Sequence, residues 1–203
     1  MKLYYSPGAC SLASHIVLRE IGKDFELESV DPSTQKTETG ADYTKINPKG
    51  YVPTLLLDDG QLLTEGAAIL QYIADQQPEA GLAPKPGTLE RARLQEHLNF
   101  IASELHNAFG PLFYPSTSDE QKQICKTKID RRMSYFESLF SDGRKHLLGD
   151  DFSVADAYFF VVSGWAVPLG IGLDKWPNVA AFSARVASRE KVRDAMHAEG
   201  LPS

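Results

Sequence analysis

The chain has little cysteine and no excess of positive charge. Only two of its 203 residues are cysteine, Cys10 and Cys125, and their separation fits no metal-ligand spacing such as Cys-x-x-Cys. A pair this distant does not suggest a disulfide framework, so each is expected to be a free thiol. The formal net charge of −6 at pH 7 argues against a general affinity for nucleic-acid phosphates or anionic lipid. The sequence therefore predicts no metal site, no nucleic-acid partner and no membrane partner.

Long apolar runs are also absent. The first ten residues, MKLYYSPGAC, contain no apolar segment of signal-peptide length, and no uncharged apolar stretch approaches twenty residues. At 42% hydrophobic and 24% charged residues, the chain can bury a sizeable core. We therefore expect a cytoplasmic globular protein with one large domain or two small ones.

The first part of the chain predicts a small mixed sheet covered by helices. The segments KLYY and FELESV are short and β-rich, and the helical pattern between them stops at Gly22. Farther on, TLLL and QLL indicate two strands joined by a tight Asp-Gly turn, and EGAAILQYIAD is typical of a helix. The polar stretch DPSTQKTETGADYTKINPKG between these units predicts a long connection with one short helix. The element order is β-α-β followed by β-β-α.

The second part of the chain predicts helices alone. Residues 78–87, PEAGLAPKPG, interrupt every periodic pattern and indicate a linker. Apolar residues at helical spacing predict one helix over about residues 88–114 and another over the segment around Ile129. Ser153 and Asp156 form a capping box at a third helix start, and Pro177 and Gly200 mark two further helices. The fold class is therefore α/β plus all-α, with domains at 1–77 and 88–203.

Five motifs, in this order, resemble bacterial glutathione S-transferases of class beta. They are YYSPGACSLASHI, NPKGYVPTLLLDDG, LLTEGAAILQYIAD, the proline-rich linker and FSVADAYFF, and the resemblance covers essentially the whole chain. It implies a thioredoxin-like first domain, glutathione as co-substrate without a metal, small electrophiles or disulfides as partners, and a homodimer. The helical domain would shape the electrophile site.

Cys10 is the first candidate catalytic residue. It follows a Pro-Gly turn and directly precedes a helix, whose free N–H groups and dipole favour an anion. This effect of roughly 0.3–1 kcal/mol lowers the thiol pKa by at most about 0.7 unit, so a second donor or cation is needed. From position alone, a small buried hydrophobe is an equal alternative, whereas the resemblance implies a catalytic thiol. Cys125 is expected to be structural.

His106 is the second candidate catalytic residue. Asn99, Ser103 and His106 are spaced by four and three residues, so they share one polar stripe of the predicted helix. Such a stripe is more often solvated surface. The resemblance implies instead that His106 lies beside Cys10 and that this helix contacts glutathione through Asn99, Ser103, Glu104, Leu105 and His106.

Two further segments supply candidate glutathione contacts. The resemblance implies a cis peptide bond before Pro53 and a backbone pairing of Val52 with glutathione; the alternative is an ordinary strand-entry proline. Glu65 and Gly66 begin a helix, where free N–H groups suit a carboxylate and Glu65 suits an ammonium. That combination fits the γ-glutamyl end of glutathione. Glu65 could instead merely complement the helix dipole.

Two residues depart from the family pattern. Class beta members often have lysine at the positions matching Gln35 and Asn107, and neither cation is present here. Lys36 could replace the first, and the affinity for glutathione is expected to be modest.

The resemblance allows two reactions and one role without catalysis. The glutathione thiolate could attack an electrophilic carbon, with Tyr5 as a further aid, or Cys10 could exchange with a glutathione disulfide. A non-catalytic binding or interaction protein on the same fold is the alternative. Aromatic residues that could line an electrophile pocket, or equally a core, are Phe109, Phe113, Tyr114 and Trp165.

Overall fold

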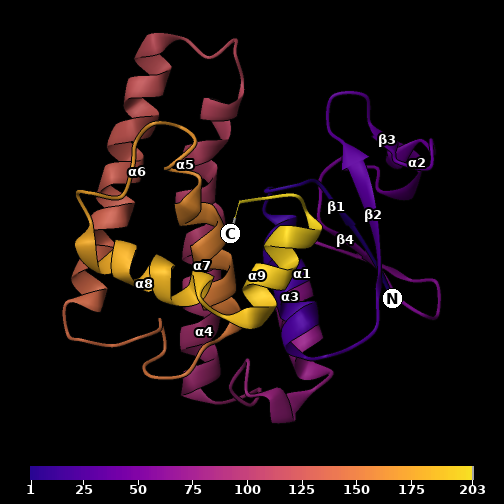
Figure 1. Ribbon diagram of the computed structural model, residues 1–203, viewed down its shortest axis with the longest axis horizontal. Coiled ribbons are helices and arrows are strands. Elements are labelled where there is room, and N and C mark those ends of the chain that lie inside the picture. Colours follow the sequence, from indigo (N-terminus) through magenta and orange to yellow (C-terminus); the bar gives the residue numbers. More distant parts are fainter. Residues whose placement is uncertain (203) are drawn as a thin grey trace. The chain divides into compact units, whose positions relative to one another are not determined.

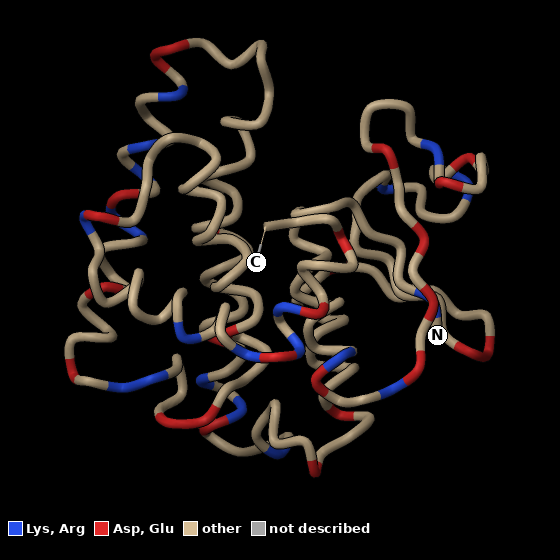
Figure 2. Tube along the Cα trace, in the orientation of Figure 1, with Lys and Arg blue, Asp and Glu red and all other residues tan. Residues whose placement is uncertain are grey.

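The computed structural model describes residues 1–202, which form two compact units. The first unit comprises Met1–Ala80 together with the chain from Ala187 onward, and the second comprises Gly81–Val186. Figure 1 shows the strands in the first unit and a helical second unit. Acidic and basic residues are interspersed along both units (Figure 2).

The first unit is built on a five-stranded sheet of order β3-β2-β1-β4-β5. Its strands are β1 (Lys2–Tyr5), β2 (Glu26–Asp31), β3 (Lys36–Thr37), β4 (Thr54–Leu56) and β5 (Leu62–Thr64). Strand β1 pairs in parallel with β2 and antiparallel with β4, and the other pairs are antiparallel. The parallel pair needs a crossover, which α1 (Ser11–Glu20) supplies, whereas β4 and β5 are joined by a short turn.

Both faces of this sheet are covered, because successive side chains of a strand point to opposite sides. Helices α1 and α3 (Gly66–Asp75) pack against each other and against the sheet. A separate apolar cluster joins Tyr4, Val30 and Tyr43, the last from the short helix α2 (Tyr43–Ile46). The cluster anchors the long connection whose end carries the Val52–Pro53 segment.

The last helix, α9 (Glu190–Ala198), packs against α1 in the first unit. It ends just before Gly200, which adopts φ +71°. The chain from Ala187 onward therefore groups with the first unit. The boundaries expected from the sequence, 1–77, 78–87 and 88–203, did not include this grouping, because it depends on contacts between segments far apart in the sequence.

The second unit contains only helices. The short 3₁₀ turn η1 (Pro78–Ala80) precedes it, and its elements are α4 (Leu89–Phe100), the π-helical segment η2 (Ile101–His106), α5 (Asn107–Phe109), the 3₁₀ turn η3 (Gly110–Phe113), α6 (Asp119–Phe140), α7 (Val154–Gly164) and α8 (Pro177–Ala187). Its core includes a cluster of rings from α6, α7 and α8, in which Phe136 and Phe159 lie 4.0 Å apart and Phe140 stacks on Phe182 at 4.8 Å. No helix within residues 1–202 is long and apolar enough to cross a membrane.

The predicted fold class, α/β plus all-α with a thioredoxin-like first part, is confirmed. The capping box is present, since the Asp156 carboxylate accepts from the backbone N–H of Ser153 at 2.8 Å. Pro177 begins α8 as expected. The helix predicted over about residues 88–114 is confirmed in extent, since Leu89–Phe113 is helical without a break. Its geometry changes from α to π, back to α and then to 3₁₀, which the apolar spacing did not predict. The short strand β3 was also missed, since two residues show no periodicity.

Candidate functional site

A tight turn presents the Cys10 thiol at the start of α1. The backbone N–H of Ala9 donates to Ser6 O at 3.0 Å, and Gly8 adopts φ +71°, which glycine accommodates without strain. Cys10 is the N-cap residue of α1 and is half-buried. Its Sγ donates to the carbonyl oxygen of Val52 at 3.4 Å. The thiol and the Val52–Pro53 segment, 42 residues apart, therefore meet at one end of the sheet.

The thiol of Cys10 is held in its protonated form. Burial raises its pKa to about 11, while the backbone N–H groups of Cys10 and Ser11 act in the opposite direction. The charge of Glu65 raises the pKa further. Desolvation therefore outweighs the helix start, as the small size of the dipole effect indicates. At neutral pH, the thiolate is therefore a very small fraction of this group in the free protein.

A buried polar chain ties the Cys10 turn to α9. The backbone N–H of Gly8 donates to Glu199 Oε2 at 3.0 Å, and Glu199 Oε1 lies 2.9 Å from His15 Nδ1. Arg19 Nε in turn donates to His15 Nε2 at 2.9 Å, so the ring proton lies on Nδ1 and points to the carboxylate. The side chains of His15 and Glu199 are fully buried. The sequence did not predict this series of hydrogen bonds, because Glu199 lies 191 residues from Gly8.

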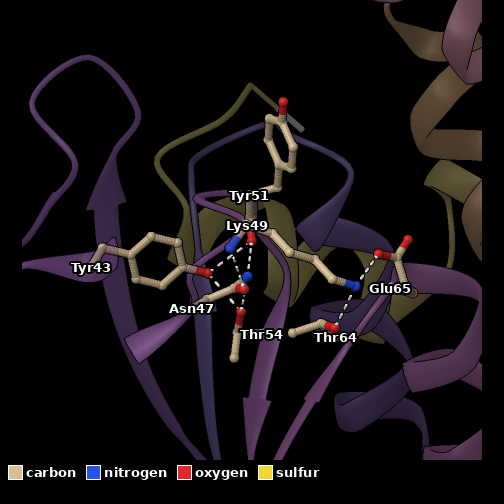
Figure 3. A network of polar contacts seen from close by, with 7 residues as sticks. All are labelled: Tyr43, Asn47, Lys49, Tyr51, Thr54, Thr64 and Glu65. Atoms are coloured by element: carbon tan, nitrogen blue, oxygen red, sulfur yellow. Dashed lines mark hydrogen bonds and ion pairs between the residues drawn. The ribbon is translucent and has the colours of Figure 1, made fainter. Parts of the chain in front are cut away.

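A second buried network shapes the segment before Pro53, whose peptide bond with Val52 is cis. Tyr43 Oη donates to Tyr51 O at 2.9 Å, and Asn47 Nδ2 donates to the same oxygen at 2.8 Å (Figure 3). Both side chains also reach Thr54 Oγ1. Because three of these groups are buried and satisfied, the turn over residues 47–51 has one well-defined conformation.

The start of α3 carries the candidate ammonium site. Glu65 has φ +72°, in the left-handed region that non-glycine residues rarely adopt, and such positions cluster at functional sites. Its carboxylate Oε1 accepts from Lys49 Nζ at 2.6 Å, and the same ammonium donates to Thr64 Oγ1 at 3.1 Å (Figure 3). Gly66 follows as the first residue of the helix. Lys49 was not anticipated from the sequence.

In the second unit, His106 closes the π-helical segment and is half-buried. Its Nδ1 lies 2.8 Å from Tyr158 Oη, and its ring meets the edge of Trp165 with centroids 4.8 Å apart. Burial lowers the pKa of His106, so the imidazole is neutral at pH 7. Cys10 and His106 belong to different units, and their approach to each other stays a prediction.

The other candidates on this helix differ in exposure. Asn99 and Ser103 are exposed, and Ser103 Oγ donates to Asn99 O at 2.8 Å. Glu104 is half-buried and accepts from Arg132 Nε at 3.1 Å, whereas Leu105 is fully buried in the core. The wider π turn disturbs the regular spacing that placed these residues on one stripe. A hollow of 260 Å³ is lined by Ser103, Glu104, Asn107, Ala108, Pro111, Gln121, Cys125, Lys128 and Arg132.

The departures from the family pattern take ordinary structural places. Gln35 has φ +55° and its side-chain amide donates to Pro32 O at 2.9 Å, within its own turn. Lys36 begins β3, and Asn107 is exposed.

The remaining candidates are aromatic. Burial raises the pKa of Tyr5. Phe109 and Trp165 are buried, whereas Phe113 and Tyr114 are exposed. Within the described part of the chain, no group of side chains could hold a metal ion.

Comparison with known proteins agrees with this geometry. Residues 8–76 match the family model of the glutathione S-transferase N-terminal domain, and residues 100–190 match that of the C-terminal domain. Glutathione S-transferase GstA of Escherichia coli O157:H7 is 48% identical over 99% of this chain and 100% of its own.

Solved structures give the same result. The bacterial beta class glutathione S-transferase of Sphingomonas chungbukensis is 50% identical, with a TM-score of 0.96 and full coverage of both chains. A sphingomonad glutathione S-transferase complexed with glutathione is 48% identical, with a TM-score of 0.95 and full coverage of both chains. With two family models spanning most of the sequence and near-superposable relatives, the chain belongs to the glutathione S-transferases, in their bacterial beta class.

Proposed function

We propose that this protein joins glutathione through its sulfur to small, largely apolar electrophiles, with Cys10 and His106 as its catalytic residues. The observation that carries the proposal is the meeting of Cys10 with the Val52–Pro53 segment at 3.4 Å, in the unit that also presents Glu65. A thiol, a backbone edge and an acidic helix start at one end of a sheet match the three parts of glutathione. The thiol of glutathione would lie near Cys10, its peptide near the Val52 backbone, and its γ-glutamyl end near Glu65.

The binding roles follow from the chemistry of each group. The backbone of Val52 can pair with the peptide of glutathione as an added strand does. Glu65 suits the ammonium of the γ-glutamyl end, and the free N–H groups at Gly66 suit its carboxylate. From the second unit, Asn99, Ser103 and Glu104 offer polar groups at the surface of the helix that ends in His106.

In the conjugation reaction, the glutathione sulfur attacks the electrophilic carbon as the thiolate. The new carbon–sulfur bond forms while the leaving group departs with its electron pair, and the thiol proton passes to solvent. When Tyr158 Oη donates to His106 Nδ1, the ring proton lies on Nε2, which can then stabilise a thiolate by hydrogen bonding. Protonated Cys10 can also donate to that sulfur.

We also propose thiol–disulfide exchange at Cys10. The Cys10 thiolate attacks the glutathione sulfur of a mixed disulfide, its S–S bond breaks and the other thiolate leaves. A second glutathione thiolate then attacks the enzyme-bound glutathione sulfur, which releases Cys10 and oxidised glutathione. Because the pKa of Cys10 is about 11 in the free protein, this route requires that ligand binding or His106 favour the thiolate.

The test measures glutathione-dependent turnover of chlorodinitrobenzene, and of a mixed glutathione disulfide, with wild type, Cys10→Ala and His106→Ala. Turnover well above the uncatalysed rate supports the transferase. Cys10→Ala should abolish exchange and lower conjugation, and full exchange activity in that variant would eliminate Cys10 as the exchanging residue. Wild-type protein that turns over neither substrate contradicts the whole proposal.

The biological setting is part of the proposal. We propose detoxification in the cytoplasm by a homodimer, as family resemblance suggests. Sedimentation velocity of the purified protein checks the oligomeric state, since a dimer of 22.4 kDa chains has twice the monomer mass. A monomer at micromolar concentration with full activity would contradict it.

A further inference from the structure

Lys49 is an exposed lysine that makes two defined contacts at the start of α3. Its ammonium donates to Glu65 Oε1 at 2.6 Å and to Thr64 Oγ1 at 3.1 Å (Figure 3). An ammonium has three N–H donors, so one remains available to a ligand. The second oxygen of Glu65, Oε2, has no hydrogen-bond partner among residues 1–202 and remains available as an acceptor. The pair thus presents one free donor beside one free acceptor.

The position of Lys49 is set by buried groups. Lys49 N donates to Asn47 Oδ1 at 3.1 Å, and the Asn47 amide is fixed in turn by Tyr51 O and Thr54 Oγ1. Asn47 is 2% exposed and Thr54 is fully buried. The backbone that carries Lys49 is therefore anchored in the first unit, although the ammonium itself reaches solvent.

The contact with Lys49 restricts the orientation of the Glu65 side chain. Its side chain is 69% exposed, and a free glutamate at such a position samples several rotamers. Its backbone already lies in a costly region at φ +72°, which orients the side chain. Lys49 and Thr64 then hold one carboxylate oxygen, so that the other is presented in a defined direction. The Glu65 charge also reaches the thiol, whose pKa it raises.

We infer that Lys49 is a positioning residue of the glutathione site: it orients Glu65 toward the ligand's ammonium and turns its free N–H donor toward the ligand's α-carboxylate. The inference rests on the proposed function. An amino-acid zwitterion carries both charges within a few atoms, and the Lys49–Glu65 pair offers the opposite charge to each. Gly66 has no side chain to contribute there, so Lys49 can add a side-chain donor to the backbone N–H groups.

The experiment is calorimetric titration of glutathione, and of glutathione with an acetylated amine, into six proteins. These are wild type, Lys49→Met, Lys49→Arg, Glu65→Gln, the double variant of Lys49→Met with Glu65→Gln, and Lys45→Met as the matched control from an exposed lysine of α2. We expect Lys49→Met to weaken glutathione binding by about threefold to tenfold, the range of roughly 0.7–1.4 kcal/mol for one exposed charge-assisted contact. Lys49→Arg should restore most of the affinity, and Lys45→Met should stay within about twofold of wild type.

The double variant separates positioning from damage to the fold. Because Lys49 acts largely through Glu65, its loss should cost less in the Glu65→Gln background than in wild type, and less for the acetylated ligand. Equal losses in all backgrounds would overturn the inference. So would unchanged or tighter binding by Lys49→Met, which would make Lys49 a bystander or a competitor of the ligand's amine. Wild type that fails to bind glutathione removes the proposed function itself, and this inference with it.

Discussion

Replacing Glu199, the C-cap residue of α9, by alanine should destabilise the protein more than a change at an exposed residue of that helix. The substitution removes the acceptor of the buried Nδ1–H of His15 and of the half-buried N–H of Gly8. Leaving a buried donor without a partner costs about 1–3 kcal/mol, so the His15 donor, a smaller loss at Gly8 and the lost packing give about 2–4 kcal/mol. Glu199→Gln keeps the shape and one acceptor oxygen, and should cost about half as much.

Urea unfolding followed by circular dichroism measures this loss. With a slope of roughly 2–3 kcal/mol/M, the midpoint of Glu199→Ala should fall by about 1–2 M. Glu190→Gln is the matched control, because Glu190 lies on the same helix and its side chain is 75% exposed. Its midpoint should stay within about 0.2 M of wild type.

The same variant tests the link to the thiol. Since Glu199 holds Gly8 in the turn that presents Cys10, Glu199→Ala should also weaken glutathione binding at temperatures where the protein remains folded. A loss of stability below about 1 kcal/mol would refute the reasoning, because it would mean that water or a shifted side chain satisfies both donors.

Three further predictions concern single groups. The alkylation rate of Cys10 by iodoacetamide in the free protein should rise about tenfold per pH unit up to about pH 11; a plateau near pH 8.5 would contradict the buried thiol. Gly66→Ala should raise the free energy of unfolding by about 0.4–1 kcal/mol, since the added Cβ would meet Pro53 Cγ at an ordinary 3.8 Å; a lower urea midpoint would show that this helix start needs glycine. Burial lowers the pKa of His97, so the unfolded chain takes up its proton first as the pH falls below about 6.5. The melting temperature should therefore drop more between pH 7.5 and 5.5 in wild type than in His97→Gln, and equal drops would argue against it.

Local signals in the sequence determined most of the secondary structure. Helix α1 ends at Glu20 just before Gly22, whose φ of +68° is the conformation that glycine supplies. The capping box of Ser153 and Asp156 begins α7, and Pro177 begins α8, as predicted. These features depend on residues within one helical turn, so a single sequence contains them. The order of five motifs likewise determined the family.

Only the tertiary structure decided how the candidate site is held. The contact of Glu199 with Gly8 joins residues 191 positions apart, and Lys49 reaches Glu65 across the β4–β5 hairpin. No periodicity encodes such pairs, because they depend on how whole elements pack. The raised pKa of Cys10 has the same origin: the helix start is visible in the sequence and favours the thiolate, whereas desolvation opposes it more strongly and exists only once the chain has folded around the sulfur.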